Sequence, residues 1–225
     1  MKYTKKFIQT VSILIAAFAF QSCKKDKENK PVSALSFVNA SVGAPTLNVY
    51  LEPNKIDFDH FSYGRYIDYL NAFSGQRTVS FFEGTVKKKT GNIDLKNGKF
   101  YSLFLAGTWP ETELVLIKDS LTIPATGKTN IRFVNMSSDA GELDLGLTNG
   151  TTLISQKAYK ASSNYISING NSTYNFVIRK HASPLDTVSI TAATLEAGRS
   201  YTIWAKGLKA EVGQNALGLT IIKNK

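Results

Sequence analysis

From residue 33 onward, apolar and polar residues alternate in short runs along the chain. Successive side chains of a β-strand point to opposite faces, so this alternation predicts strands with one buried face and one exposed face. Glycine, asparagine, serine and proline separate the runs, and no stretch keeps a helical period. The pattern predicts an all-β chain, with strands in TLNVYL (46–51), RTVSFFEG (77–84), KFYSLFLAG (99–107), ELDLGL (142–147), TYNFVIR (173–179) and SYTIWAKG (200–207).

The same order of motifs occurs twice, which indicates an internal duplication. LSFVNASVGAPTLNVYL (35–51) aligns without a gap with IRFVNMSSDAGELDLGL (131–147), and LKNGKFYSLFLAG (95–107) aligns with LEAGRSYTIWAKG (195–207). We therefore expect two tandem domains, 33–121 and 128–225, joined by a linker at 122–127. Seven or eight strands with frequent turns in roughly 95 residues predict an immunoglobulin-like Greek-key β-sandwich for each domain.

The first thirty residues have a different pattern. A basic segment, MKYTKK, precedes an apolar run of 14 residues from Phe7 to Phe20, and the only cysteine, Cys23, follows closely. Because roughly 20 apolar residues are needed to span a bilayer, this run predicts a signal peptide, residues 1–22, rather than a transmembrane helix. The stretch FQSC, with Ser22 directly before Cys23, resembles the lipobox of bacterial lipoproteins in the relaxed form common among Bacteroidota.

The resemblance implies cleavage before Cys23, a diacylglyceryl thioether on its sulfur and an acyl group on the new amine. The alternative is an ordinary secretory signal with a free thiol. Phe20 stands where leucine is more usual in a lipobox. The charged run from Lys24 to Pro31 has no apolar residue, so residues 23–32 are expected to form a lipidated, flexible tether. We expect a lipoprotein of the outer membrane in the cell envelope, with display on the cell surface left open.

Charge and motif content narrow the classes of partner and activity. Removal of the signal peptide with its three lysines lowers the net charge from +10 to +7, which still favours anionic surroundings. The basic residues are scattered, so no nucleic-acid partner is predicted. The run Lys87–Lys89 is read as a hairpin tip, with lipopolysaccharide or an acidic glycan as the functional alternative. A nucleophile elbow and a glycine-rich phosphate loop are both lacking from the sequence, so we predict a non-enzyme without a cofactor.

The second copy carries a family resemblance. IRFVNMSSDAGELDLGL, Tyr165 before Gly170, and LEAGRSYTIWAKG resemble the pattern of domain of unknown function 4397, a family of secreted, often tandem, immunoglobulin-like domains that are frequent in Bacteroidota lipoproteins. The first copy departs from it between Val42 and Pro45 and at Asn48. The resemblance implies the fold and the location, but no activity. The second copy matches the pattern at Arg132, Val134, Ser137, Asp139, Ala140 and Asp144.

Comparison of the two copies separates structural aromatic residues from candidate binding residues. Trp204 aligns with Phe104, which predicts equivalent core positions. Trp109 and Tyr66 have no aromatic counterpart. An unmatched aromatic side chain in a loop could stack on a sugar ring or anchor a protein partner, and Trp109 could equally cap its own core. Further pairs that recur, and for which we expect structural roles, are Tyr101 with Tyr201, Tyr63 with Tyr159 and Tyr69 with Tyr165.

Asp139, Glu142 and Asp144 place three carboxylates within six residues of a predicted turn. Calcium takes roughly six to eight oxygen ligands, so the cluster is a candidate cation site. We favour an Asx-type turn, because the first copy lacks all three charges. A second cluster, Asp57, Asp59 and His60, would point its members to opposite faces of a strand, which disfavours metal binding. The remaining histidine, His181, is expected in an exposed hairpin loop.

These observations predict a lipid-anchored, non-catalytic protein of the cell envelope that acts in binding, adhesion or structure. One alternative is an accessory glycan-binding lipoprotein of an uptake system, and another is a cation-dependent adhesion domain. The expected partners are the membrane, through the lipid anchor, and a glycan or an envelope or matrix protein. Because loops vary freely on a rigid sandwich, recognition is expected in the loops.

Overall fold

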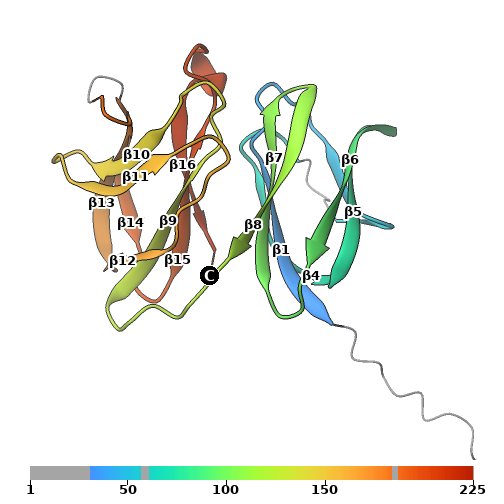
Figure 1. Ribbon diagram of the computed structural model, residues 1–225, viewed down its shortest axis with the longest axis horizontal. Helices are drawn as coiled ribbons and strands as arrows, with labels where there is room; N and C mark the ends of the chain where they lie inside the picture. The colour runs from blue at the N-terminus through green and yellow to red at the C-terminus, as the bar shows by residue number, and fades with distance from the viewer. Residues whose placement is uncertain (1–30, 57–60, 184–186, 225) are drawn as a thin grey trace, which may run out of the picture. The chain divides into compact units, whose positions relative to one another are not determined.

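The computed structural model describes residues 31–56, 61–183 and 187–224 (Figure 1). The predicted signal peptide, Cys23 and nearly all of the predicted tether lie outside the described residues, as do Asp57, Asp59 and His60. Within the described ranges, no helix is long and apolar enough to cross a membrane.

The described residues confirm the all-β class. One short 3-10 helix, Gly213–Asn215, interrupts a series of strands. In the first half these are β1 (Val32–Asn39), β2 (Asn48–Leu51), β3 (Asn54–Lys55), β4 (Tyr66–Phe73), β5 (Gly75–Glu83), β6 (Val86–Leu95), β7 (Phe100–Thr108) and β8 (Glu111–Asp119). In the second half they are β9 (Lys128–Asn135), β10 (Leu143–Leu147), β11 (Thr152–Lys157), β12 (Ile166–Asn169), β13 (Ser172–Lys180), β14 (Thr187–Leu195), β15 (Ser200–Lys206) and β16 (Gly218–Lys223).

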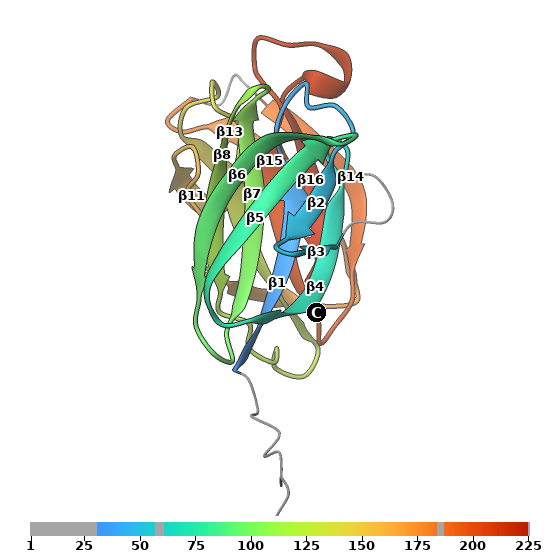
Figure 2. The ribbon, with the colours of Figure 1, turned by 90° about the vertical axis from the view of Figure 1, so that its right-hand side faces the viewer.

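Each half forms two sheets with the same strand order. Strands β1–β8, the first sandwich, form the sheets β4-β1-β7-β8 and β3-β2-β5-β6. Strands β9–β16, the second sandwich, form β12-β9-β15-β16 and β11-β10-β13-β14 (Figures 1 and 2). The parallel pair β1–β7 recurs as β9–β15. The predicted β-sandwich fold is confirmed, and each strand of the first sandwich has a counterpart in the second.

Alternation along the strands produces the core of each sandwich. In TLNVYL, Leu47, Val49 and Leu51 are buried between the sheets, whereas Asn48 and Tyr50 point outward and are half-buried. A fully buried leucine or phenylalanine stabilises the fold by roughly 1.5–3 kcal/mol, so these alternating positions supply most of the driving force. Other members of the first core are Leu35, Phe37, Phe81 and Leu103, and their counterparts in the second are Ile131, Phe133, Phe176 and Ile203.

A third apolar cluster joins the two sandwiches. Trp204 and Phe104, which occupy equivalent positions, meet edge to face with ring centroids 5.9 Å apart. Both rings are fully buried. Strands β1, β7, β9 and β15 are therefore covered on both faces, and residues 31–225 form a single compact unit. The cluster consists of Val38, Ala40, Phe104, Ala106 and Ile117 with Val134, Met136, Trp204 and Ile222.

A buried polar network lies beside this cluster. Arg132 Nη1 of β9 is 2.5 Å from Asp119 Oδ1 of β8, and their side chains are 2% and 0% exposed. Arg132 also donates from Nε to Thr202 Oγ1 at 2.8 Å and from Nη2 to Ser102 Oγ at 3.1 Å. The Ser102 hydroxyl in turn donates to Asp119 Oδ2 at 2.7 Å. A buried ion pair needs such additional hydrogen bonds to offset its desolvation, and this one has them on both partners.

Two equivalent tyrosines enclose the network. The Tyr69 hydroxyl donates to Asp119 Oδ2, and the Tyr165 ring lies 5.1 Å from the Arg132 guanidinium carbon. Burial, followed by the charge of Asp119 and its hydrogen bond, raises the pKa of Tyr69. Burial also raises the pKa of Tyr165 to about 12, although the charge of Arg132 opposes the shift. Both phenols therefore stay protonated at neutral pH and remain hydrogen-bond donors.

Candidate functional site

Trp109 lies in the turn between β7 and β8, at the end of the first sandwich. Its backbone N–H donates to the Val42 carbonyl at 2.9 Å. Its side chain is half-buried and packs against the first core. Of the two roles that the sequence left open, the contacts match the cap on the core.

We expect Trp109→Ala to lower the free energy of unfolding by about 1–3 kcal/mol, less than the loss for a fully buried tryptophan. Urea denaturation measures this change. Tyr66→Ala is the matched control, because the Tyr66 side chain is 45% exposed and its loss should cost under about 0.5 kcal/mol. Wild-type stability in Trp109→Ala would instead identify the indole as a surface side chain that is available to a ligand.

Tyr66 does not share a surface with Trp109. It is the first residue of β4 and pairs with Val38 of β1. Residues directly opposite each other on antiparallel strands project from the same face of the sheet. Tyr66 is therefore on the face of Val38, which belongs to the cluster between the sandwiches, whereas Trp109 packs on the other face of that sheet.

Asp139 holds a loop of the second sandwich. Its two carboxylate oxygens accept the backbone N–H groups of Lys209 at 2.7 Å and Ala210 at 3.0 Å, in the connection from β15 to β16. Burial disfavours the charged form, but these hydrogen bonds outweigh it and lower the pKa of Asp139. The carboxylate is therefore an acceptor for a loop far away in sequence, which the pattern around residue 139 did not predict.

The other two carboxylates, of Glu142 and Asp144, have hydrogen-bond partners that differ from those of Asp139. Asp144 Oδ1 accepts the Gln156 backbone N–H at 2.6 Å and lies 2.9 Å from His181 Nδ1. Glu142 accepts Gln156 Nε2 at 3.3 Å. Across the described residues, no three potential ligands gather into a metal-binding group. Each carboxylate of the candidate cation site at Asp139, Glu142 and Asp144 thus accepts hydrogen bonds from protein donors, and the three carboxylates do not share a donor atom. His181 lies in the predicted hairpin turn after β13, but it is half-buried beside Asp144 rather than fully exposed.

A recess on the outer sheet of the second sandwich was not predicted. It has a volume of about 200 Å³ and lies where β10 ends and β13 begins. Its lining combines one aromatic ring with amide and hydroxyl groups, from Leu147, Thr148, Asn149, Thr173, Tyr174 and Asn175.

The ring of the recess is held from two sides. Tyr174 stacks on the buried Phe176 ring, with centroids 5.4 Å apart and an angle of 25° between the planes. Its hydroxyl donates to the Asn169 carbonyl at 2.8 Å. Because the ring is fixed before any ligand arrives, binding to it requires little loss of side-chain entropy.

The two asparagines of the recess are also fixed. Asn149 Oδ1 accepts the Thr151 backbone N–H at 3.1 Å, and Asn175 Oδ1 accepts the Ala192 N–H at 2.8 Å. Ala192 has a positive φ of 54°, opposite a register shift between Tyr174 and Phe176. Such bulges re-aim side chains. With its oxygen engaged, each amide keeps its NH₂ group as a donor, and none of the described residues accepts from either Nδ2.

Comparisons with known proteins give information on the family of this chain, but not on the ligand that it binds. The C-terminal domain of AlgF from P. aeruginosa is 19% identical, with a TM-score of 0.33 over 44% of this chain and 99% of that one. A carbohydrate-binding module of family CBM26 from Eubacterium rectale Amy13K, solved with maltoheptaose, is 10% identical, with a TM-score of 0.29 over 86% of this chain and 97% of that one. At TM-scores below 0.5, neither likeness indicates what this chain binds. Comparison with curated proteins gives no match. Residues 33–146 match the family described as domain of unknown function (DUF4397), and the chain belongs to that family.

Proposed function

We propose that the protein is a lipid-anchored, non-catalytic binding module of the cell envelope that binds a glycan in the recess around Tyr174. The observation that carries this proposal is a fixed aromatic ring beside two anchored asparagine amides. A sugar ring presents apolar C–H groups on its face and hydroxyls at its rim. The Tyr174 ring suits the face, and the Asn149 and Asn175 donors suit the hydroxyls.

The other parts of the proposal rest on the sequence and on the charge groups of the fold. Lipidation of Cys23 would tether residues 31–225 to the outer membrane. The non-catalytic role rests on the sequence, in which a nucleophile elbow and a glycine-rich phosphate loop are both lacking. The acids of the predicted cation site are engaged by protein donors, which favours a glycan-binding module over a cation-dependent adhesion domain.

We expect Tyr174→Ala to weaken glycan binding by at least about thirtyfold, the effect of losing a central aromatic contact. A glycan array probed with residues 24–225 identifies the ligand, and calorimetry with that glycan measures the affinity of the variant. The soluble chain is suitable because the three apolar clusters consist entirely of residues 35–222.

Tyr50→Ala is the matched control. Tyr50 is a half-buried tyrosine on the outer sheet of the first sandwich, where it contacts Phe82 with ring centroids 4.8 Å apart. The second sandwich has Gly146 at the equivalent position, so the fold does not require this ring. Loss of binding in Tyr50→Ala alone would contradict the recess and place the ligand beside Tyr50, Phe82 and Lys87. Loss of glycan binding in Tyr66→Ala alone would place the binding site at Tyr66, one of the residues predicted from the sequence.

A further inference from the structure

Exposed apolar side chains gather at the end of the first sandwich where β1 begins. We call this end, together with the adjoining linker, the basal face; it is the lower end in Figure 1. Val32 is 43% exposed and Phe73 is 52% exposed. Backbone bonds from Ser74 to Pro31 and from Gly98 to Val32, both 2.8 Å, hold the β4–β5 and β6–β7 turns against the start of β1. The apolar residues therefore occupy fixed positions rather than a loose end.

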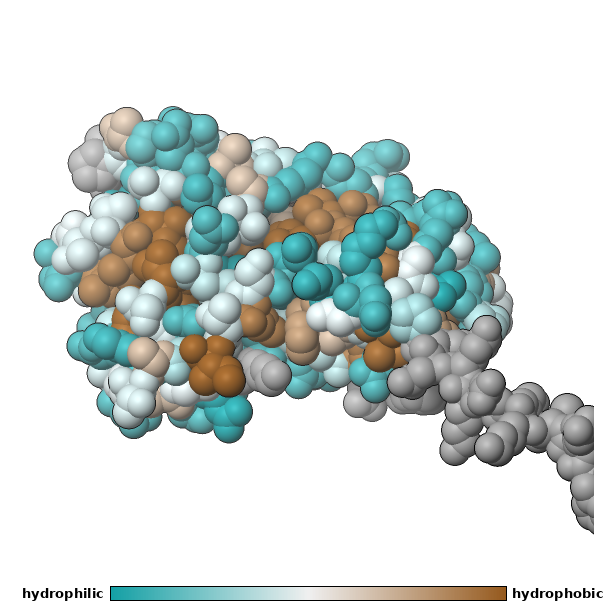
Figure 3. Space-filling model, turned by 60° about the horizontal axis from the view of Figure 1, so that its bottom comes forward, coloured by the Kyte–Doolittle hydropathy of each residue, from teal (hydrophilic) through white to brown (hydrophobic). Residues whose placement is uncertain are grey.

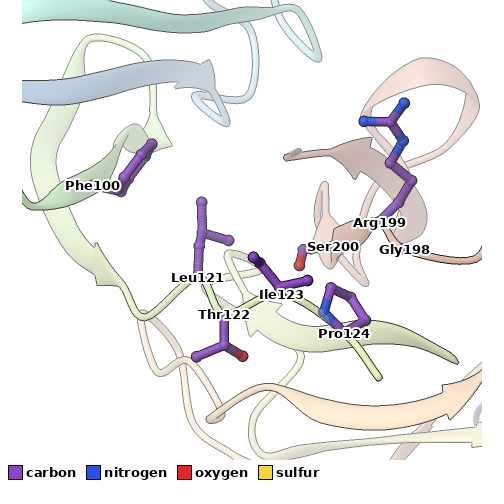
Figure 4. Close-up of a pocket in the computed structure, with 8 residues that line it drawn as sticks. All are labelled: Phe100, Leu121, Thr122, Ile123, Pro124, Gly198, Arg199 and Ser200. Carbon is purple, nitrogen blue, oxygen red and sulfur yellow. The ribbon is translucent and has the colours of Figure 1, made fainter. Parts of the chain in front are cut away.

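The linker extends the basal face to the second sandwich. Ile123 is 96% exposed, and it borders a recess of about 190 Å³ whose lining comes from both sandwiches. Phe100 of β7 lies on one side and Arg199 on the other, with the linker residues between them (Figure 4). Asn130 Nδ2 donates to the Thr122 carbonyl at 3.3 Å, which fixes the linker next to Ile123. Ile123 thus adds an exposed apolar side chain beside this recess.

Basic side chains surround these apolar residues. Lys99, Lys128 and Arg199 are exposed at the turns and strand ends of the basal face. Asp94 pairs with Lys96 at 2.5 Å, and Glu196 pairs with Lys223 at 2.8 Å and with Arg199 at 3.7 Å, so the charge of Arg199 is partly offset and Lys99 and Lys128 contribute most of the positive charge. Figure 3, in which the lower end comes forward, shows brown apolar atoms among teal polar ones. The face therefore presents both exposed apolar and exposed basic side chains.

The lipid anchor would lie close to this face. β1 begins at Val32, and an extended chain from Cys23 to Pro31 reaches at most roughly 27 Å. This step rests on the proposed function, because it requires that Cys23 be acylated. A bilayer that holds those acyl chains then lies within that distance of the basal face.

We propose that the basal face is a docking surface for a bilayer that contains anionic phospholipid. Ile123 enters the interface between headgroups and acyl chains, and Lys99, Lys128 and Arg199 contact lipid phosphates. A single acyl chain binds a membrane only marginally, and a second, basic or apolar, signal makes the attachment durable. Docking would fix the orientation of the sandwiches, with the β15–β16 loop and Trp109 directed away from the membrane.

The test uses residues 23–225 with Cys23→Ser, so that no lipid anchor contributes. The protein is mixed with phosphatidylcholine vesicles that contain about one-third phosphatidylglycerol, and bound protein is measured by flotation. We expect binding to these vesicles, weaker binding to pure phosphatidylcholine, and a loss of binding at high salt because exposed charges are screened.

Variants then identify the surface. Ile123→Asp should lower the partition coefficient about tenfold. Lys99→Gln and Lys128→Gln should each lower it about fivefold, the worth of one basic residue near an anionic surface. Val212→Asp is the matched control, because Val212 is 84% exposed and lies in the β15–β16 loop at the other end of β15. It should leave binding unchanged.

Absence of binding to anionic vesicles would overturn the proposal, and so would equal losses in Ile123→Asp and Val212→Asp. Failure of the proposed function is seen separately. Mass spectrometry of the native protein shows whether Cys23 is acylated, and the glycan affinity of Tyr174→Ala is measured in solution without a membrane.

Discussion

Replacement of Arg132 with serine is expected to lower the free energy of unfolding by about 3–5 kcal/mol, because it leaves the Asp119 carboxylate buried without its cation. The Asp119 side chain is 0% exposed, so water cannot take the place of the guanidinium without opening the contact between the sandwiches. Ser102 and Tyr69 still donate to the carboxylate, but two neutral donors do not replace a charge. Urea denaturation followed by circular dichroism measures the loss.

The internal repeat supplies the control for this prediction. In the alignment Ser36 is the counterpart of Arg132. Lys118 pairs with Tyr101 as Lys223 pairs with Tyr201, so the next residues, Asp119 and Asn224, are also counterparts, and Asn224 donates to Tyr69 at 3.3 Å. The double variant Arg132→Ser with Asp119→Asn therefore gives both sandwiches an uncharged set. We expect the double variant to lose about 2 kcal/mol less stability than the sum of the two single losses, since it leaves no unpaired charge. Strict additivity, or a loss below about 1 kcal/mol in Arg132→Ser, would contradict the ion pair as the central element of this network.

The sequence contains a pattern that indicates the contact between the sandwiches, but the prediction of strands from alternation did not use it. Alternation predicted one buried face for each strand, and this was right for Val49 and Leu145. In β1 and β9, however, Phe37 and Val38 are both buried, as are Phe133 and Val134. Near-continuous apolar runs are typical of strands covered on both faces. The duplication was read from the same motifs, but only the arrangement of the sheets shows that the copies pack on each other.

The candidate binding residues were harder to predict, because their surroundings come from distant segments. The sequence placed Asp139 in a turn as a candidate cation ligand, but its hydrogen-bond partners lie about seventy positions away, at Lys209 and Ala210. Tyr174 looked like an ordinary strand residue. Asn175, which lines the recess, accepts a hydrogen bond from Ala192 at a bulge whose extra residue lies in β14, so TYNFVIR itself carries no sign of it. The search for aromatic residues without a counterpart in the other copy identified Trp109 and Tyr66. It could not distinguish a ring that caps the core from a ring exposed at the surface.

Trp204→Ala is expected to cost about 3–5 kcal/mol, the range for removal of a fully buried tryptophan. Its ring is the largest side chain in the cluster between the sandwiches, and it contacts Phe104 edge to face. Trp204→Phe is the matched variant, because phenylalanine already occupies the equivalent position. It should cost much less, since most of the ring is kept and the buried Nε1, for which the described residues provide no acceptor, is removed.

The Trp204→Ala variant also tests whether the two sandwiches unfold together. The chain has two tryptophans, so in Trp204→Ala the fluorescence comes from Trp109, which packs on the first core. Circular dichroism reports on the strands of both sandwiches. With the shared cluster weakened, we expect the fluorescence and dichroism transitions in urea to separate, whereas in the wild-type protein they should coincide. Coincident transitions in Trp204→Ala would show that the polar network of Arg132 and Asp119 couples the sandwiches without the apolar cluster. Separate transitions already present in the wild-type protein would show that each sandwich is stable without the other, and that neither cluster couples their unfolding.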